Sequence, residues 1–142
     1  LGGLDLWQIS MKPGKPFAYG QVRRSSQAGR AHFVGLPGNP VSSYVTLLLM
    51  VRPLILRLQG APAEPLPRMS VRADFAWSRP DKRREFLRVR RNAQGGLDLF
   101  HNQSSGVLTS LVWADGLVDN PSMQAIVPGD LVSYLPLAEA IF

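Results

Sequence analysis

The sequence predicts an α/β segment at residues 1–60 followed by a small all-β, barrel-like domain at residues 68–142. Three observations lead to this fold class. The first segment has the order strand, turn, strand and helix. After residue 68, apolar residues recur with a period of two, which is typical of half-buried strands. Between them, residues 61–67 hold three prolines directly after Gly60, a composition that cannot continue a helix and predicts a linker.

The first segment has the elements of one edge of an α/β domain. A first predicted strand has Trp7, Ile9 and Met11 on one face, and the chain runs on through a turn at residues 13–14 to Val22. A second strand covers residues 31–36. A helix is expected next, because Asn39 is a favoured N-cap and the proline after it suits the first helical position. A kink is expected at Pro53. The apolar stripe of this helix consists of Val41, Tyr44, Val45, Leu48 and Val51.

The second domain is predicted to consist of short strands joined by glycine turns. Strand alternation places Arg88 and Arg90 together on one face and leaves the apolar residues beside them for the core. One short helix is expected to interrupt the strands at residues 106–114, begun by one of the two serines before it. Several short strands with regular turns indicate a small barrel or sandwich.

Composition excludes several classes of function. The chain has no cysteine, which excludes disulfides, thiolate metal sites and cysteine nucleophiles. No apolar run reaches the roughly 18 residues needed to span a bilayer, because Arg52 and Pro53 interrupt the longest candidate. No signal peptide is visible. We therefore expect a cytoplasmic protein without a membrane partner, and the missing initiator methionine indicates a sequence that begins within a longer protein.

Positive charge is concentrated in the first segment. The whole chain has a formal net charge of +6, and residues 1–60 hold seven Lys or Arg against the single acid Asp5, which accounts for all of it. Such an excess favours an anionic partner. Phosphate, an oxyanion, a nucleic acid and an acidic surface all remain open on this ground.

Two rigid loops in the basic segment are candidate anion sites. In residues 35–43 a strand leads into a Gly/Pro loop that begins a helix, whose free backbone N–H groups suit an anion. Gly38 allows close approach and Ser42 adds a hydroxyl. The alternative is that Asn39 only caps the helix. In residues 12–16, two prolines and a glycine fix a turn from which two ammonium groups project, and the alternative is a solvated turn.

Two further features lie in the second domain. Residues 79–91 hold seven Lys or Arg, which form either a solvated face or an anion-binding surface. Nucleic acid is the rival partner, although Phe86 is the only aromatic residue in this run and no RNA-binding motif is present. Ser104 and Ser105 offer a second oxyanion contact or a plain cap. No nucleophilic triad or Walker-type loop appears, so the inventory suits electrostatic positioning of an oxyanion.

Four motifs in register resemble the molybdopterin molybdenumtransferase family, which includes the MoeA enzymes and the E domain of gephyrin. Residues 11–20 resemble its MKPGKP segment, and residues 35–42 resemble its GLPGNPVS segment, with 51–54 in the expected place after it. Residues 83–88 and 105–111 resemble its C-terminal barrel. The resemblance covers essentially the whole chain. It implies the C-terminal strands and helix of a three-layer α/β molybdopterin-binding domain, followed by a small β-barrel.

The resemblance also implies an activity, the insertion of molybdate into adenylated molybdopterin with Mg²⁺ and release of AMP. Carried over residue by residue, the catalytic group consists of Lys12, Lys15, Arg88 and Ser105. Arg83 is a weaker candidate than Arg88. The cofactor-binding group consists of Pro13, Gly14, Pro37, Gly38, Asn39, Pro40 and Ser42.

The resemblance further implies that the magnesium ligands and the dimerisation regions lie upstream of these motifs. No metal ligand is therefore expected in this chain. Family enzymes are homodimers with a site shared between subunits, so we expect the 142 residues to fold without turning over substrate alone. A gephyrin-like scaffold is the first alternative, and a basic nucleic-acid-binding barrel is the second.

Overall fold

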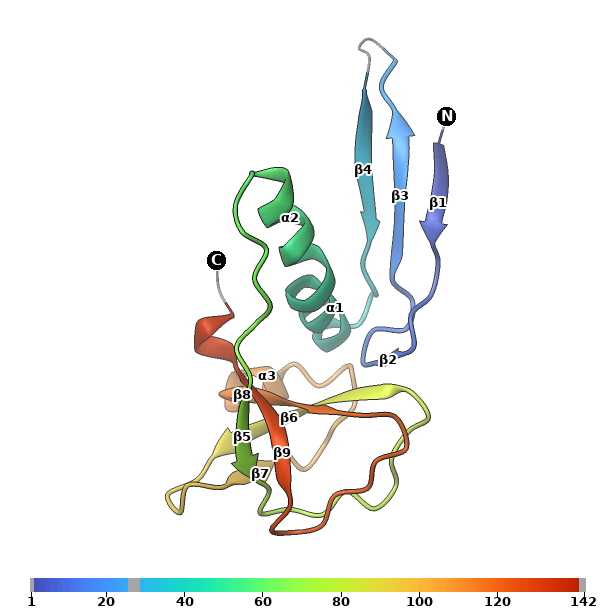
Figure 1. Ribbon diagram of the computed structural model, residues 1–142. Coiled ribbons are helices and arrows are strands. Elements are labelled where there is room, and N and C mark those ends of the chain that lie inside the picture. The colour runs from blue at the N-terminus through green and yellow to red at the C-terminus, as the bar shows by residue number, and fades with distance from the viewer. Residues whose placement is uncertain (1, 26–28, 141–142) are drawn as a thin grey trace.

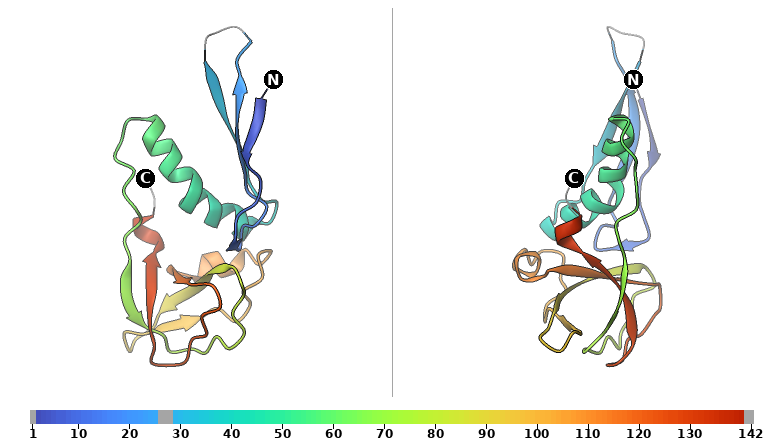
Figure 2. Two further views of the ribbon diagram at one scale, coloured as in Figure 1. Left: turned by 45° about the vertical axis from the view of Figure 1, so that its right-hand side comes forward. Right: turned by 60° about the vertical axis from the view of Figure 1, so that its left-hand side comes forward.

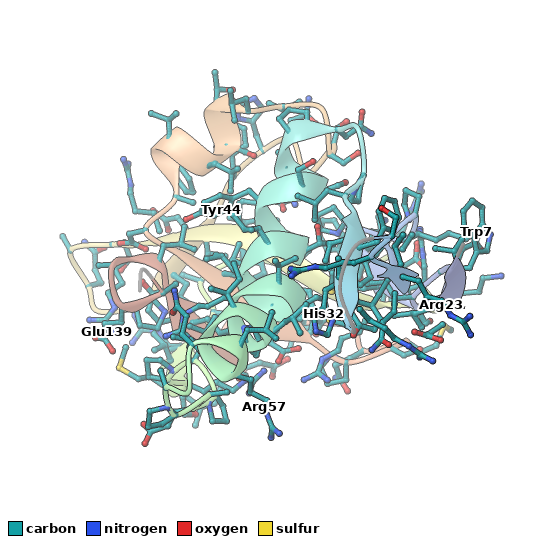
Figure 3. All side chains as sticks on the ribbon, turned by 90° about the horizontal axis from the view of Figure 1, so that it is seen from above. Trp7, Arg23, His32, Tyr44, Arg57 and Glu139 are labelled. Atoms are coloured by element: carbon teal, nitrogen blue, oxygen red, sulfur yellow. The ribbon has the colours of Figure 1, made fainter. Side chains whose placement is uncertain are left out.

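A three-stranded sheet and a long helix rise from one side of a barrel in the computed structural model, which describes residues 2–25 and 29–140 (Figures 1 and 2). The sheet is antiparallel, with the order β1-β3-β4. Its strands are β1 (Gly2–Leu6), β3 (Ala18–Arg23) and β4 (Arg30–Gly35). Trp7 follows β1 as an exposed side chain at the outer rim of the molecule, outside the strand that was predicted to include it (Figure 3).

The helical run changes type along its length. It consists of α1 (Pro40–Thr46), the π-helical η1 (Leu47–Val51) and α2 (Arg52–Leu58). Pro53 has no backbone N–H to donate to the carbonyl four residues earlier, and the wider π turn falls immediately before it. The helix thus changes its hydrogen-bonding pattern where a kink was predicted. Gly60 follows the last turn with φ of +73°.

Length and composition alone would allow the helix from Pro40 to Leu58 to cross a membrane. A core helix of a soluble protein passes the same test. In this fold the buried Val41 and Val45 pack in one cluster with Met11, Phe86 and the neighbouring barrel strands. About one third of the apolar window, 33%, is buried by such packing.

The rest of the chain forms a six-stranded sheet in the order β2-β6-β8-β9-β5, with β7 paired to β6. Its short first strand, β2 (Met11–Lys12), comes from the first segment and pairs in parallel with β6. The other strands are β5 (Met69–Arg72), β6 (Arg84–Arg91), β7 (Leu97–Leu99), β8 (Gly116–Asn120) and β9 (Leu131–Pro136). An α/β segment followed by a small barrel, as the sequence predicts, is confirmed.

Residues 61–68 form neither helix nor strand and run back from the end of α2 to β5 (Figure 2). They are not a free linker, because the Ala61 N–H donates to the Leu56 carbonyl at 2.9 Å and Leu66 packs against the cluster beneath the helix. The division of the chain into domains at this point stays a prediction, since β2 already joins the first segment to the barrel sheet.

The barrel sheet packs against apolar clusters on both of its faces. Apolar residues therefore occur at successive positions of a strand and not only at every second one. Leu87 and Val89 of β6 point into an inner cluster, whereas Phe86 points into the outer cluster beneath α1. The inner cluster consists of Ala73, Phe75, Leu87, Val89, Leu97, Val118, Ile126 and Tyr134. The outer cluster consists of Met11, Val41, Val45, Phe86, Leu117 and Leu135.

This two-sided burial corrects the expected surroundings of Arg88. Arg88 is only 1% exposed, whereas Arg90, two residues along the same strand, is exposed and lies 4.6 Å from the centre of the Trp113 ring. The helix predicted at residues 106–114 is also shorter. It begins only at α3 (Thr109–Trp113), because the residues around Gly106 form hydrogen-bonded turns instead. A final 3₁₀ turn, η2, covers Leu137–Glu139.

Candidate anion-binding site

Three separate segments meet around one cavity of about 440 Å³. They are the turn at residues 12–16, the loop that begins α1, and residues 103–105 of the barrel, with Arg83 beside them. The lining residues are Lys12, Pro13, Gly14, Lys15, Pro16, Pro37, Gly38, Asn39, Ser42, Arg83, Gln103, Ser104 and Ser105. Of the residues that the sequence analysis assigned to the site, only Pro40 and Arg88 do not line this cavity.

The turn that carries both lysines is held by its backbone. The Lys15 carbonyl accepts hydrogen bonds from the Ile9 N–H at 3.1 Å and from the Phe17 N–H at 2.9 Å. Gly14 has φ of +123°, a conformation that favours glycine. Lys15 is exposed, and within the described chain no carboxylate forms an ion pair with it. Its ammonium group is therefore available to an anion.

Asn39 occupies the predicted N-cap position, but its side chain does not cap the helix. The Asn39 Nδ2 instead donates to the Ser105 Oγ at 2.9 Å, and the Val41 N–H donates to the Ser105 carbonyl at 3.2 Å. The helix start and the barrel are thus joined across the cavity at Ser105. The Val41 N–H, one of the backbone donors at the helix start, is therefore already hydrogen-bonded and is not free for an anion.

Arg88 lies behind the wall formed by residues 103–105. Its guanidinium donates to the Ser104 carbonyl at 3.2 Å, to the Phe86 carbonyl at 3.3 Å and to the Ser110 Oγ at 3.2 Å. The Gln103 side chain bonds both the N–H and the carbonyl of Arg88, at 2.9 and 3.0 Å. Burial lowers the pKa of Arg88 to about 10. The structure therefore shows Arg88 as an anchor of the cavity wall, where the sequence analysis expected an anion contact.

Arg83 takes the position in the cavity that was expected of Arg88. It lies just before β6, where the chain is irregular, and it lines both this cavity and a neighbouring one of about 800 Å³. Lys15 is also shared by the two cavities. Asp81 was the feature of the sequence that could have indicated a fixed position for Arg83, because an acid two residues away can hold a guanidinium in place. The hydrogen bond from Arg83 lowers the pKa of Asp81 far below its usual range.

Metal coordination in the same region would need His, Asp or Glu side chains, since the chain has no cysteine. Across residues 2–25 and 29–140, no group of three or more His, Asp or Glu side chains is arranged to hold a metal ion. The two acids nearest the cavity are Asp81 and Glu85, and both are paired with the Lys12 ammonium, at 3.4 and 3.3 Å. The donor set of the described chain thus suits an anion.

Known proteins share both parts of this architecture. A molybdopterin molybdenumtransferase from Haemophilus influenzae is 50% identical over 60 residues, 42% of this chain. Molybdopterin molybdenumtransferase 2 of Mycobacterium tuberculosis is 32% identical over 84% of this chain. Residues 2–57 match a probable molybdopterin binding domain, and residues 70–137 match the MoeA C-terminal region (domain IV). The chain belongs to the molybdopterin molybdenumtransferase family.

Solved structures of related proteins have the same fold. A molybdenum cofactor biosynthesis protein from Pyrococcus furiosus superposes with a TM-score of 0.76 at 20% identity, over 95% of this chain and 46% of its own. The molybdopterin biosynthesis MoeA protein of Pyrococcus horikoshii also gives 0.76 at 20% identity, over 96% and 33%. The fold class is thereby confirmed. The chain spans only 28% of the Mycobacterium tuberculosis molybdenumtransferase, and its match to the Haemophilus one covers 13%.

Proposed function

We propose that this chain forms the oxyanion-binding part of a molybdopterin molybdenumtransferase, which inserts molybdate into adenylated molybdopterin and releases AMP. The observation that carries the proposal is the 440 Å³ cavity in which Lys15 and Arg83 face the hydroxyl-bearing Ser42 and Ser105. The cations come from the lysine turn and from the residue before β6, and the hydroxyls come from the start of α1 and from the loop at residues 103–105. A dianion such as molybdate, or the phosphate of a pterin ligand, requires this combination of charge and donors.

In the proposed reaction these residues stabilise charge and do not transfer protons. The Lys15 ammonium and the free edge of the Arg83 guanidinium bind the oxyanion. The Ser42 and Ser105 hydroxyls donate hydrogen bonds that orient it. Such preorganised donors stabilise the charge that shifts onto oxygen as oxygen leaves molybdenum and the phosphoanhydride is cleaved. The turn at Gly14 and the Asn39–Ser105 bond hold the donors in place beforehand.

The proposed enzyme acts with Mg²⁺ as a cytoplasmic homodimer. Magnesium does not fit the described residues around the cavity, because the carboxylates of Asp81 and Glu85 are already paired with Lys12 and Asp81 also holds Arg83. The magnesium ligands are expected in the part of the family's sequence outside these motifs. The 440 Å³ cavity lies between three segments and is consistent with a site completed by further protein.

The basic run at residues 79–91 does not form the continuous face that a nucleic-acid-binding barrel needs. Arg83 is paired with Asp81, Arg84 is paired with Asp119 at 2.5 Å, and Arg88 is buried. These side chains point to different parts of the barrel, which supports the oxyanion proposal over the nucleic-acid alternative.

Calorimetric titration of molybdate tests the proposal. We expect wild-type binding that weakens by roughly 10- to 100-fold in Lys15→Ala and in Arg83→Ala, since each loses a charge-assisted contact of about 1.5–3 kcal/mol. Arg57→Ala serves as the control, because Arg57 lies in the last turn of α2, outside the cavity (Figure 3). Absent binding, or binding unchanged in both cavity variants, would contradict an oxyanion site in this chain.

A further inference from the structure

Four charged side chains beside the cavity form one connected cluster, and only two of them line the cavity. Lys12 and Arg83 line it, whereas Asp81 and Glu85 do not. Glu85 is 1% exposed, and the Asp81 side chain is 19% exposed. Asp81 lines the neighbouring cavity of about 800 Å³ instead. Each carboxylate thus contacts a cation of the 440 Å³ cavity without lining that cavity.

Asp81 holds the Arg83 guanidinium by one edge. Its Oδ1 accepts from the Arg83 Nε at 2.9 Å and from the Arg83 backbone N–H at 2.9 Å, and its Oδ2 accepts from an Arg83 terminal nitrogen at 2.8 Å. A guanidinium has five N–H donors in a rigid fork. The side-chain pairing with Asp81 uses two of them and leaves three for a ligand, so Asp81 fixes the orientation of Arg83 without occupying its binding edge.

Glu85 fixes Asp81 and Lys12 in turn. Its Oε2 accepts from the Trp77 Nε1 at 2.7 Å and from the Asp81 backbone N–H at 3.1 Å. Its Oε1 lies 3.3 Å from the Lys12 ammonium, and the β2–β6 pairing places Lys12 directly beside Glu85. Lys12 also lies 3.4 Å from Asp81. The buried Glu85 therefore connects the barrel to the lysine turn of the first segment.

We propose that Asp81 and Glu85 are positioning residues that hold Arg83 and Lys12 at the cavity, so that oxyanion affinity depends on two carboxylates outside the cavity. The inference rests on the proposed oxyanion function and deepens it. Asp81 acts through Arg83, and Glu85 acts through Asp81 and Lys12. In this arrangement Lys15 and Arg83 carry most of the contact with the anion, because the Lys12 charge is already balanced by two carboxylates.

The sign of one substitution separates positioning from simple charge repulsion. Asp81→Asn removes a negative charge next to an anion site, and Coulomb's law alone predicts tighter anion binding. Positioning predicts the reverse, because an amide cannot hold both guanidinium donors and Arg83 then loses its fixed orientation. We expect molybdate binding to weaken by about tenfold, the scale seen when an outer hydrogen-bond partner is removed from a metal ligand.

The chain offers a matched control for this substitution. Asp74 holds Arg72 by the same two-donor geometry, at 2.7 and 3.0 Å and also two residues apart, but neither residue lines the cavity. Asp74→Asn is therefore expected to leave molybdate binding unchanged. A double substitution supplies the second control. In an Arg83→Gln background, Asp81→Asn should cause no further loss of molybdate binding, because the guanidinium that Asp81 orients is already absent.

Calorimetry on the four variants and wild type, with thermal melts to verify folding, decides the inference. Weaker binding in Asp81→Asn, with Asp74→Asn unchanged and no added loss in the double variant, supports it. Equal or tighter binding in folded Asp81→Asn overturns it and leaves the oxyanion site intact. A further loss in the Arg83→Gln background also overturns it, since Asp81 then acts by another route.

Side-chain NMR keeps the inference separate from the proposed function. If wild type fails to bind molybdate, the proposed oxyanion site in this chain is wrong, and hydrogen exchange at the Arg83 Nε–H then tests positioning alone. Slow exchange in wild type that becomes fast in Asp81→Asn supports positioning. Exchange in wild type as fast as at Arg57, in the last turn of α2, overturns it.

Discussion

Replacing Arg88 with alanine is expected to lower the free energy of unfolding by about 3–5 kcal/mol. The substitution empties a buried site and removes the guanidinium donor from the Phe86 carbonyl, the Ser104 carbonyl and the Ser110 hydroxyl. The Ser104 carbonyl keeps a second donor, the Val107 N–H at 3.3 Å. Removal of a buried cation with no carboxylate beside it in the described structure offsets part of this cost. Urea denaturation measures the change. Molybdate binding should weaken as well, because the wall at residues 103–105 loses its anchor.

Arg90→Ala is the matched control on the same strand. Arg90 is exposed and its guanidinium lies over the Trp113 ring, so its loss should cost less than about 1 kcal/mol. Arg88→Met adds a second comparison, since it keeps the apolar stem but removes charge and donors. We expect a smaller loss of stability than in Arg88→Ala, with an equal loss of molybdate binding. Equal stability of the Arg88→Ala and Arg90→Ala proteins would show that Arg88 is not a structural anchor.

The sequence predicts which residues line the cavity where the conformation of the neighbouring backbone determines their position. The lysine turn and the start of α1 depend on nearby prolines and glycines, and both lie in the cavity as expected. The strand alternation of β6 is also local, and Leu87 and Val89 point into the core as predicted. These features follow from backbone conformations that a few neighbouring residues determine.

Local patterns could not show that Arg83, and not Arg88, lines the cavity. Alternation shows which face of β6 carries Arg88, but not that Gln103 and Ser104, about fifteen residues later, cover that face. Arg83 lies before the strand, where no period applies, and its orientation depends on Asp81. The partner of the Asn39 side chain could not be predicted either, because Ser105 lies 66 residues later in the chain. Contacts across 15 and 66 residues determine the surroundings of Arg88 and Asn39, whereas Arg83 depends on a neighbour two residues away in an irregular segment.

Gly14→Ala is expected to combine a loss of stability with a loss of anion binding. A Cβ at this position would lie 2.5 Å from the Thr46 Cγ2 and 2.8 Å from the Met11 Cε, and φ of +123° is strained for any L side chain. Strain of about 1–3 kcal/mol and overpacking of about 1–3 kcal/mol together predict a decrease of roughly 2–6 kcal/mol in the free energy of unfolding.

The binding effect of Gly14→Ala separates the role of the turn from its contribution to the fold. Gly14 lies between the two lysines. A shift of the turn away from Thr46 therefore changes the position of the Lys15 ammonium relative to Arg83 in the cavity. We expect weaker molybdate binding even at temperatures where the variant is fully folded. Gly3→Ala is the control, because a Cβ on Gly3 meets no atom within 4 Å and its stability should change by less than about 0.5 kcal/mol. A folded Gly14→Ala protein that binds molybdate like wild type would show that the anion does not depend on the placement of this turn.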